Sequence, residues 1–345
     1  MHNVILGGCG FIGYNLALDL LNRGEQVTVL DNLSRKGTTH NLQNLYNHSF
    51  ARYFQFRHAD IRLDQKVLEE VVGQADVVYH LAAQVAVTTS VIDPGLDFQI
   101  NLLGTFNVLE ALRKTKSKAI LIYASTNKVY GGMEEIIIEK GEDQYYYRDK
   151  PLGIAEDQNL DFHSPYGCSK GAAEQYTRDY TRIYGLKTIC FRQSCIYGPS
   201  QFGIEDQGWI AWFTIAAMYG KPITIYGDGM QVRDVLHVSD LIKGYRAAIQ
   251  NIERTNGQIY NMGGGPNNQL SLLKLLSILE LKLGKKIPFS FDKWRPGDQP
   301  VYVSNISKIM EQSGWHPEIS FDKGLDALLD WAKDNRAILT QVGII

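Results

Sequence analysis

Two residues four positions apart, Tyr166 and Lys170, could carry out proton transfer in this chain. On a helix, residues at this spacing lie one turn apart on the same face. A free tyrosine has a pKa of about 10 and is a poor base at neutral pH, but a nearby ammonium group favours the phenolate and lowers that pKa. The pair could therefore take a proton from a substrate hydroxyl. Because a hydroxyl that loses its proton usually also loses a hydride, the chain should contain a site for a hydride acceptor.

A glycine-rich turn near the N-terminus predicts that site. A short apolar strand, Val4 to Leu6, leads into Gly7-Gly8-Cys9-Gly10-Phe11-Ile12-Gly13, and a helical pattern follows from Tyr14 to Asn22. Gly7, Gly10 and Gly13 permit a tight turn, the close approach of a pyrophosphate and the packing of helix on strand. The N-terminus of the helix then faces the phosphates with its positive end.

An acidic residue identifies the preferred dinucleotide. Asp31 ends the next strand, Gln26 to Leu30, and stands 18 residues after Gly13. At that place a carboxylate binds the adenosine ribose hydroxyls and repels a 2′-phosphate, which favours NAD. Arg35 could hold such a phosphate, so NADP remains an alternative.

Alternating strands and helices predict the fold that positions these residues. Apolar strand patterns recur at 53–56, 76–80, 118–123 and 188–191. We expect an α/β fold, with a Rossmann-type doubly wound parallel sheet and a smaller C-terminal α/β substrate-binding lobe. Residues 1–190 would form the NAD-binding domain, with about 230–262 returning to it, and residues 191–345 would mainly bind a nucleotide sugar. Ligands of such sheets lie beyond the carboxyl ends of the strands, where Asp60, Leu81-Ala82-Ala83 and Thr126 fall.

The whole-chain composition narrows the class of protein. The 345 residues are 44% hydrophobic and 21% charged, with a net charge of -2. This balance gives no indication of a nucleic-acid or membrane surface. The N-terminus runs straight into a strand and no apolar run is long enough to span a membrane, so a cytoplasmic location is expected. Cys9, Cys168, Cys190 and Cys195 lack metal-ligand spacing and are interpreted as buried thiols, and no metal site is expected.

These landmarks together resemble the extended short-chain dehydrogenase/reductase superfamily, specifically its nucleotide-sugar epimerases and dehydratases. Within it the chain is most similar to the CDP-paratose 2-epimerase (CDP-tyvelose epimerase) family. The runs that carry the closer resemblance are Asp31-Asn32-Leu33-Ser34-Arg35-Lys36-Gly37, Gln84-Val85-Ala86-Val87-Thr88-Thr89-Ser90, Ser125-Thr126-Asn127-Lys128-Val129-Tyr130-Gly131, Asp161 to Gly171, Asp206-Gln207-Gly208-Trp209 and Gln231 to His237, whereas Arg295-Pro296-Gly297-Asp298 belongs to the superfamily pattern. One position departs from the family pattern, because Gln193 stands where the family has a histidine, and this bears on the sugar that is bound.

The resemblance implies roles for individual residues. Thr126, Tyr166 and Lys170 would be the catalytic triad, in which Thr126 bonds the reacting hydroxyl, Tyr166 is the base, and Lys170 holds Tyr166 and the nicotinamide ribose. Residues expected to bind the cofactor are Gly7, Gly10, Phe11, Ile12, Gly13, Asp31, Asn32, Ser34, Arg35, Asp60, Ile61, Leu81, Ala82, Ala83, Asn101, Tyr166 and Lys170. Residues expected to bind the substrate are Gln84, Ser125, Thr126, Asn127, Gln193, Cys195, Gln207, Trp209, Arg233, Arg295 and Asp298. Both arginines would grip the nucleotide pyrophosphate.

The residues after Thr126 separate the possible reactions. A 4,6-dehydratase needs a carboxylic acid and a carboxylate there, and Asn127 and Lys128 supply neither. Asp31 argues against a reductase that exchanges NADPH. An epimerase needs only a base, a hydroxyl anchor and one tightly held NAD. This chemistry fits inversion at C2 or at C4, so the choice of C2 rests on the resemblance, and a UDP-hexose 4-epimerase or a non-catalytic NAD-binding sensor remains an alternative.

Three further segments carry structural expectations. Residues 133–164 form a long polar excursion that could be a lid or sugar-pocket wall, a subunit contact or an inert loop. Residues 269–283 are expected to form an amphipathic helix with a leucine-rich core face. His80, Asp234 and His237 are interpreted as structural residues. By resemblance to the superfamily, the chain is expected to form a homodimer or homotetramer through the helix after Asp97 and the helix that carries Tyr166.

Overall fold

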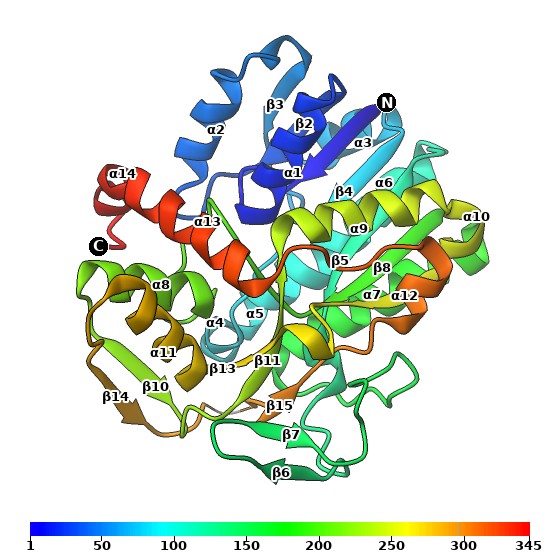
Figure 1. Ribbon diagram of the computed structural model, residues 1–345. Helices are drawn as coiled ribbons and strands as arrows, with labels where there is room; N and C mark the ends of the chain where they lie inside the picture. The colour runs from blue at the N-terminus through cyan, green and yellow to red at the C-terminus, as the bar shows by residue number, and fades with distance from the viewer. Residues whose placement is uncertain (296) are drawn as a thin grey trace.

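A single parallel sheet organises the cofactor half of the molecule. The computed structural model describes residues 1–295 and 297–345, and in that part of the chain seven parallel strands follow the order β12-β8-β5-β4-β1-β2-β3 (Figure 1). The strands are β1 (His2–Leu6), β2 (Gln26–Asp31), β3 (Phe54–His58), β4 (Val77–His80), β5 (Ile120–Thr126), β8 (Lys187–Gln193) and β12 (Gln258–Met262). The expected α/β fold with a Rossmann-type sheet is confirmed.

Helices cover both faces of this sheet, as Figure 1 shows. They are α1 (Phe11–Asn22), α2 (Thr38–Tyr46), α3 (Gln65–Gly73), α4 (Val87–Ile92), α5 (Pro94–Phe98), α6 (Gly104–Lys114), α7 (Ser164–Tyr184), α9 (Val238–Gln250), α10 (Ile252–Thr255) and α12 (Ser307–Ser313). Successive strand residues point to opposite faces. In β1, Ile5 packs with α1 and α9, whereas Val4 and Leu6 pack with α3 and α6. Burial on both faces explains why the strands are apolar without alternation.

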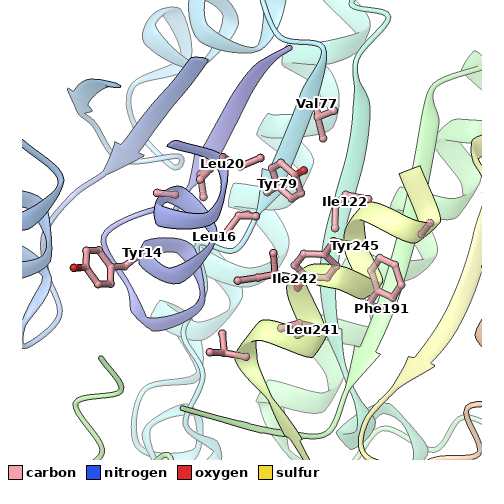
Figure 2. Packing of buried hydrophobic residues seen from close by; sticks show 14 of the residues in the cluster. Tyr14, Leu16, Leu20, Val77, Tyr79, Ile122, Phe191, Leu241, Ile242 and Tyr245 are labelled. Atoms are coloured by element: carbon pink, nitrogen blue, oxygen red, sulfur yellow. The ribbon is translucent and has the colours of Figure 1, made fainter. Parts of the chain in front are cut away.

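The core on the α1 and α9 face is aromatic at its centre. Figure 2 shows Leu16 and Leu20 of α1 packing toward Tyr79 of β4, and Tyr245 of α9 lying between Tyr79 and Phe191 of β8. The ring centroids of Tyr245 lie 6.1 Å from Tyr79 and 5.1 Å from Phe191. Helix α9 is therefore part of the core of the cofactor half, although it follows the strands of the substrate half in the chain.

In the part of the chain that the structure describes, the substrate half is built from short strands and four helices. Strands β9 (Cys195–Tyr197), β11 (Val232–His237), β13 (Gln269–Ser271) and β15 (Val301–Tyr302) form a small mixed sheet, and β10 (Ile223–Tyr226) pairs with β14 (Phe289–Asp292). The helices are α8 (Trp209–Tyr219), α11 (Leu272–Leu283), α13 (Phe321–Asp334) and α14 (Arg336–Gln341). The division at residues 190 and 191 stays a prediction. Of residues 230–262, α9 and β12 join the cofactor half, whereas β11 belongs to the small sheet.

Two expectations about local structure were wrong. The helix expected over residues 269–283 begins at Leu272, because Gln269–Ser271 pairs with β11 and the Ser271 hydroxyl caps the helix by accepting from Lys274 N at 3.2 Å. The cysteines were all expected to be buried, but Cys168 is exposed on the outer face of α7 and Cys195 is only partly buried.

The excursion after β5 is fastened to the substrate half. It contains the hairpin of β6 (Ile138–Lys140) and β7 (Tyr145–Tyr147), which lies beside β15 at the bottom of Figure 1. The Tyr145 hydroxyl donates to Asp228 at 2.6 Å, and the Tyr147 hydroxyl donates to the Val301 carbonyl at 2.8 Å. These contacts fasten the hairpin to the substrate half.

Candidate active site

The three predicted catalytic residues meet where β5 ends beside α7. Thr126 is the last residue of β5, and Tyr166 and Lys170 lie on the first turns of α7. All three are buried, with exposed fractions of 6%, 8% and 3%. The Thr126 hydroxyl lies close enough to Tyr166 for a hydrogen bond that lowers the pKa of the phenol. The base and the hydroxyl anchor are therefore adjacent, while their roles stay a prediction.

The expected effect of Lys170 on the pKa of Tyr166 was wrong. Burial raises the pKa of Tyr166 to about 12, and burial lowers the pKa of Lys170 to about 7. The Lys170 ammonium donates to the Ala124 carbonyl at 2.5 Å and lies 4.4 Å from the centre of the Tyr123 ring, so it is directed at β5. Desolvation disfavours the charged form of each group and is the largest cause of both shifts.

A buried ion pair between Glu174 and Arg192 lies next to the site. Glu174, one turn after Lys170 on α7, accepts hydrogen bonds from Arg192 at 3.0 and 2.7 Å and from the Ser125 hydroxyl at 2.7 Å. Arg192 also donates to the Tyr130 hydroxyl at 2.9 Å. This network joins β8 to β5 and α7, the two elements that carry the predicted catalytic residues.

The glycine turn forms a cradle that fits a dinucleotide. Gly7 has a φ of +83°, and a Cβ at Gly7 would lie 2.6 Å from the backbone nitrogen of Ala82. A Cβ at Gly13 would overlap the Gly7 carbonyl, so this glycine permits the contact between helix and turn. A Cβ at Gly10 would meet only the Gly7 carbonyl oxygen, at 3.4 Å, and Gly10 lines the cavity. Each glycine therefore has the function that a pyrophosphate cradle requires.

Backbone hydrogen bonds fix the Asp31 carboxylate, and one of them comes from the glycine-rich turn. Its carboxylate accepts from the backbone N–H of Cys9 at 2.9 Å and of Leu33 at 2.8 Å. Burial raises the pKa of Asp31, while these two hydrogen bonds act in the opposite direction. Asp60 is bonded by Arg62 and by Asn32, and the Arg62 hydrogen bonds lower its pKa to about 2.

One cavity of about 590 Å³ connects the glycine turn to Tyr166 and Lys170. Of the predicted cofactor residues, it is lined by Gly7, Gly10, Phe11, Ile12, Gly13, Asp31, Asn32, Ser34, Arg35, Asp60, Ile61, Leu81, Ala82, Ala83, Tyr166 and Lys170. Asn101 does not line it, because its amide is buried behind the wall and bonds the backbone of Gln84 at 3.0 and 3.1 Å. Residues 133–164, all of which the structure describes, do not line this cavity, which argues against a lid over it.

Part of the predicted substrate set faces the same cavity. Gln84, Ser125, Gln193 and Gln207 line it. The side-chain amide of Gln193 donates to the Tyr245 hydroxyl, which fixes the residue that departs from the family pattern against the α9 core. Gln207 accepts from Arg35, so a hydrogen bond joins the loop after β2 to the loop before α8.

A second group of predicted substrate residues is organised by Asp298. The Asp298 carboxylate accepts from Arg233 at 2.5 Å and lies 3.5 Å from the Lys128 ammonium. Burial would raise the pKa of Asp298, but the charges of Arg233 and Lys128 hold it below its ordinary value. The backbone N–H of Lys128 donates to the Thr126 hydroxyl at 3.2 Å, so this cationic group adjoins the predicted catalytic threonine.

The remaining predicted substrate residues lie around these two groups. Asn127 is buried, and its side-chain oxygen lies 3.4 Å from the Thr126 hydroxyl. Trp209 donates to the Cys195 sulfur at 3.2 Å. The Arg295 guanidinium stacks 4.0 Å from the centre of the Tyr226 ring and pairs with Asp206 at 3.1 Å. Arg233 and Arg295 therefore have separate partners, and a joint grip on one pyrophosphate stays a prediction.

Several residues at the site have no pattern that sequence reasoning could use. Lys128 drew attention only as a residue that cannot do dehydratase chemistry, yet it pairs with Asp298, 170 positions away. Ser200, Gln201, Phe202, Gly203 and Ile204 line the cavity from a loop whose position only the tertiary structure sets.

A glycine cradle that opens toward a buried threonine, tyrosine and lysine at the carboxyl edge of a parallel sheet defines the short-chain dehydrogenase/reductase class. The family model described as GDP-mannose 4,6 dehydratase matches residues 4–328. The chain belongs to this family, within the extended short-chain dehydrogenase/reductases, and is a nucleotide-sugar epimerase by its similarity to the relatives that follow.

Those relatives are matched along almost their whole length. CDP-paratose 2-epimerase of Salmonella typhi is 46% identical over 96% of this chain and 99% of that protein. A putative UDP-glucose 4-epimerase of Methanocaldococcus jannaschii is 33% identical over 96% of this chain and 98% of that protein. The structure of UDP-glucuronic acid 4-epimerase from Bacillus cereus, in complex with UDP-glucuronic acid and NAD, is 31% identical with a TM-score of 0.83, over 97% of this chain and 99% of that one. In the described residues, none of the helices could cross a membrane.

Proposed function

We propose that this chain is a nucleotide-sugar 2-epimerase of the CDP-paratose/CDP-tyvelose type that works with tightly bound NAD. The observation that carries the proposal is the set of groups around Thr126. Tyr166 supplies a buried base beside the Thr126 hydroxyl. The two residues that follow Thr126 in the sequence are Asn127, which carries an amide, and Lys128, which carries an ammonium group. The site therefore has the parts for transient oxidation but lacks the carboxyl pair for elimination at that position. The 46% identity to a CDP-paratose 2-epimerase supports the choice of C2.

NAD fits the residues of the cavity. Gly7, Gly10 and Gly13 would receive the pyrophosphate, and the Asp31 carboxylate would bind the adenosine ribose and repel a 2′-phosphate. The same cavity reaches Tyr166 and Lys170, where the nicotinamide end would lie. Bound there, NAD would accept a hydride from the sugar carbon and return it to the opposite face.

The chain's own residues manage the proton and the orientation of the sugar. Thr126 bonds the C2 hydroxyl, and Tyr166 takes its proton as the 2-keto sugar forms. Lys170, bonded to the Ala124 carbonyl one turn from Tyr166, would hold the nicotinamide ribose, and the hydrogen bond with Thr126 is what lowers the pKa of Tyr166. The keto sugar then turns about its pyrophosphate tether, and Tyr166 returns the proton to the oxygen.

The cluster of Asp298, Arg233 and Lys128 is suited to bind the pyrophosphate of the nucleotide sugar. Two cationic side chains, Arg233 and Lys128, share one carboxylate, so the group carries a net positive charge beside Thr126. Only 10% of the Arg233 side chain is exposed, and a guanidinium in such a place binds phosphate strongly. CDP is the favoured nucleotide because of the relative named above, and GDP and UDP sugars are the alternatives for the test.

A 4-epimerase of UDP-hexoses is the second candidate. The same base, hydroxyl and cofactor serve inversion at C4, and proteins named as 4-epimerases match nearly the whole chain at 33% and 31% identity. A non-catalytic NAD-binding sensor is disfavoured, since the tyrosine–lysine pair and Arg233 are all present.

The proposal includes a homodimer or homotetramer in the cytoplasm. Helices α6 and α7 pack side by side, and both present apolar side chains to solvent. Phe106 is 36% exposed, Tyr176 47% and Ile183 65%. Exposed apolar side chains gathered on neighbouring helices are typical of a protein interface.

The test is NMR of purified protein with CDP-, GDP- and UDP-sugars in heavy water, without added NAD. Inversion at C2 without deuterium at C2 is expected, because the hydride that leaves is the one returned. Deuterium at the inverted carbon would mean proton abstraction from carbon and would refute the mechanism. Inversion at C4 alone would establish the second candidate.

A further inference from the structure

A buried carboxylate outside the predicted catalytic set lies close to Lys170. Asp97 is fully buried and belongs to α5, which a π-helical turn (η2, Gln99–Leu103) continues. Asp97 and Asn101 are four positions apart, and both side chains bond Ser169 of α7, the residue before Lys170. Backbone geometry thus brings a carboxylate to the turn of α7 that carries the catalytic lysine.

Neutral groups alone bond the Asp97 carboxylate within the described chain. One oxygen accepts from the Ser169 hydroxyl at 2.5 Å. The other accepts from the side-chain amides of Asn101 at 3.0 Å and Gln84 at 3.1 Å. These bonds orient the carboxylate but bring no positive charge to it.

Lys170 is the matching case of a positive charge that is bonded by neutral groups. Its ammonium donates to the Ala124 carbonyl at 2.5 Å and lies over the Tyr123 ring. Within residues 1–295 and 297–345, no ion pair joins Lys170 or Asp97 to an opposite charge at contact distance. A buried charge without a counter-charge is costly, so two opposite charges on adjoining turns stabilise each other.

The other titratable groups near Lys170 are less suited to this role, although Glu174 and Cys190 also oppose the lowering of its pKa. Glu174 is closely paired with Arg192, which neutralises it. Burial, with the charge of Lys170 adding to it, lowers the pKa of His80 to about 3, so His80 is neutral. Burial also raises the pKa of the Cys190 thiol and of the Tyr123 and Tyr166 phenols, and all three are neutral at pH 7.

We propose that Asp97 is a positioning residue whose negative charge keeps Lys170 in its ammonium form and holds that end of α7 against α5. Each of the two groups affects the pKa of the other. Burial lowers the pKa of Lys170 to about 7, and Asp97 is the largest influence that opposes this shift. Burial raises the pKa of Asp97, and Lys170 is among the groups that oppose that rise. The proposal rests on the proposed function for the catalytic role of Lys170, but the charge coupling can be measured without catalysis.

Asp97→Asn separates charge from hydrogen bonding. The asparagine oxygen can accept from Asn101 and Gln84 as the carboxylate does. Its NH₂ group then faces Ser169, whose hydroxyl can accept from it and donate to the Tyr166 carbonyl, 3.2 Å away. Ser169→Ala is the matched control, because it removes a hydrogen bond to Asp97 and keeps the charge.

The experiment is an NMR pH titration of protein labelled with ¹³C at the lysine ε-carbon, with the Lys170 signal assigned by its loss in Lys170→Met. We expect Lys170 to titrate about one pH unit lower in Asp97→Asn and unchanged in Ser169→Ala. An unchanged titration in Asp97→Asn would overturn the proposal, as would an equal shift in Ser169→Ala. In active protein, the alkaline limb of the kcat profile of Asp97→Asn should move to lower pH by the same amount.

A reciprocal measurement covers the case in which Asp97→Asn does not fold. In Lys170→Met, the ¹³C signal of the Asp97 carboxyl should titrate at a higher pH than in the wild-type protein, because its counter-charge is gone. An unchanged Asp97 titration would overturn the proposal. Failure of the wild-type protein to epimerise any nucleotide sugar would count against the proposed function and leave both titrations to decide the coupling.

Discussion

Lys170 donates a hydrogen bond from its ammonium nitrogen to the carbonyl oxygen of Ala124 at 2.5 Å. Ala124 lies two residues before Thr126 on β5, and Lys170 lies one turn after Tyr166 on α7. This contact is one of several that fasten α7 to β5, together with the hydrogen bond from the Ser125 hydroxyl to Glu174 at 2.7 Å. These contacts bring the hydroxyl of Thr126 and the phenol of Tyr166 together.

Loss of the Thr126 hydroxyl should raise the pKa of Tyr166, the proposed base. The hydrogen bond with Thr126 lowers the pKa of Tyr166, which burial otherwise raises to about 12. Thr126→Val should therefore make the phenolate harder to form and reduce kcat by roughly 100-fold, whereas Thr126→Ser should keep most activity. Both variants should retain bound NAD, measured by its release in acid. A Thr126→Val enzyme as fast as the wild type would rule out this role.

The two predicted phosphate-binding arginines should behave differently. Arg233 pairs with Asp298 beside Thr126, while the more exposed Arg295 stacks on Tyr226 and pairs with Asp206. Arg233→Gln should raise KM for the nucleotide sugar by about 10- to 100-fold, the range of one charge-assisted hydrogen bond. Arg295→Gln should raise it less. Steady-state kinetics on both variants at matched NAD content would decide, and equal effects would mean that both grip the pyrophosphate.

An aromatic contact between the halves should slow the loss of NAD. Phe202 packs on the backbone of Gly37, where a Cβ would overlap its ring, and lies edge-on to Trp331 with centroids 5.4 Å apart. Because Phe202 lines the cavity and meets the loop after Asp31, Phe202→Ala should release bound NAD faster during dialysis. Phe289→Ala, which truncates an exposed ring on β14, is the control. Equal retention in both variants would show that this contact does not close the cavity.

The parts of the site that sequence could predict are those set by local geometry. Gly7, Gly10 and Gly13 follow from a strand-turn-helix pattern, and the helical spacing of Tyr166 and Lys170 already placed them on one face. Strand ends likewise placed Asp31 and Thr126 at one edge of the sheet. Parallel strands bring such residues together whatever the rest of the chain does.

The parts that sequence could not predict depend on burial and on distant partners. The shift in the Tyr166 pKa had the wrong sign because the depth of burial is a tertiary property. The strand at Gln269–Ser271 forms only because β11 lies beside it, although its sequence continues the pattern of a helix. Asp97 belongs to no recognisable motif, and its proposed role depends on its hydrogen bond with Ser169, 72 positions away in the sequence.

The stability of the cofactor edge should depend on pH in the acid range. Two hydrogen bonds from Arg62 hold the pKa of Asp60 at about 2, below the ordinary value of about 4. The lowered pKa contributes stability that is present above about pH 4 and is lost as the pH falls toward 2. Arg62→Ala should lower the free energy of unfolding by about 1–2 kcal/mol at pH 7, and the difference should shrink below pH 4. Urea unfolding tests this, with the exposed pair variant Arg57→Ala as a control that should change little.

The apolar face of α6 and α7 should hold two subunits together. Ile183 is 65% exposed on α7, and the ring centroids of Phe106 and Tyr176 lie 6.0 Å apart across the two helices. A charge placed in a desolvated interface is costly, so Ile183→Glu should produce monomers that keep the far-ultraviolet circular dichroism of the wild type. Sedimentation velocity measures this directly. Leu281→Glu, at an 85% exposed position of α11, should leave the oligomer intact. A wild-type protein that sediments as a monomer, or an Ile183→Glu variant that stays associated, would place the interface elsewhere or remove it from the proposal.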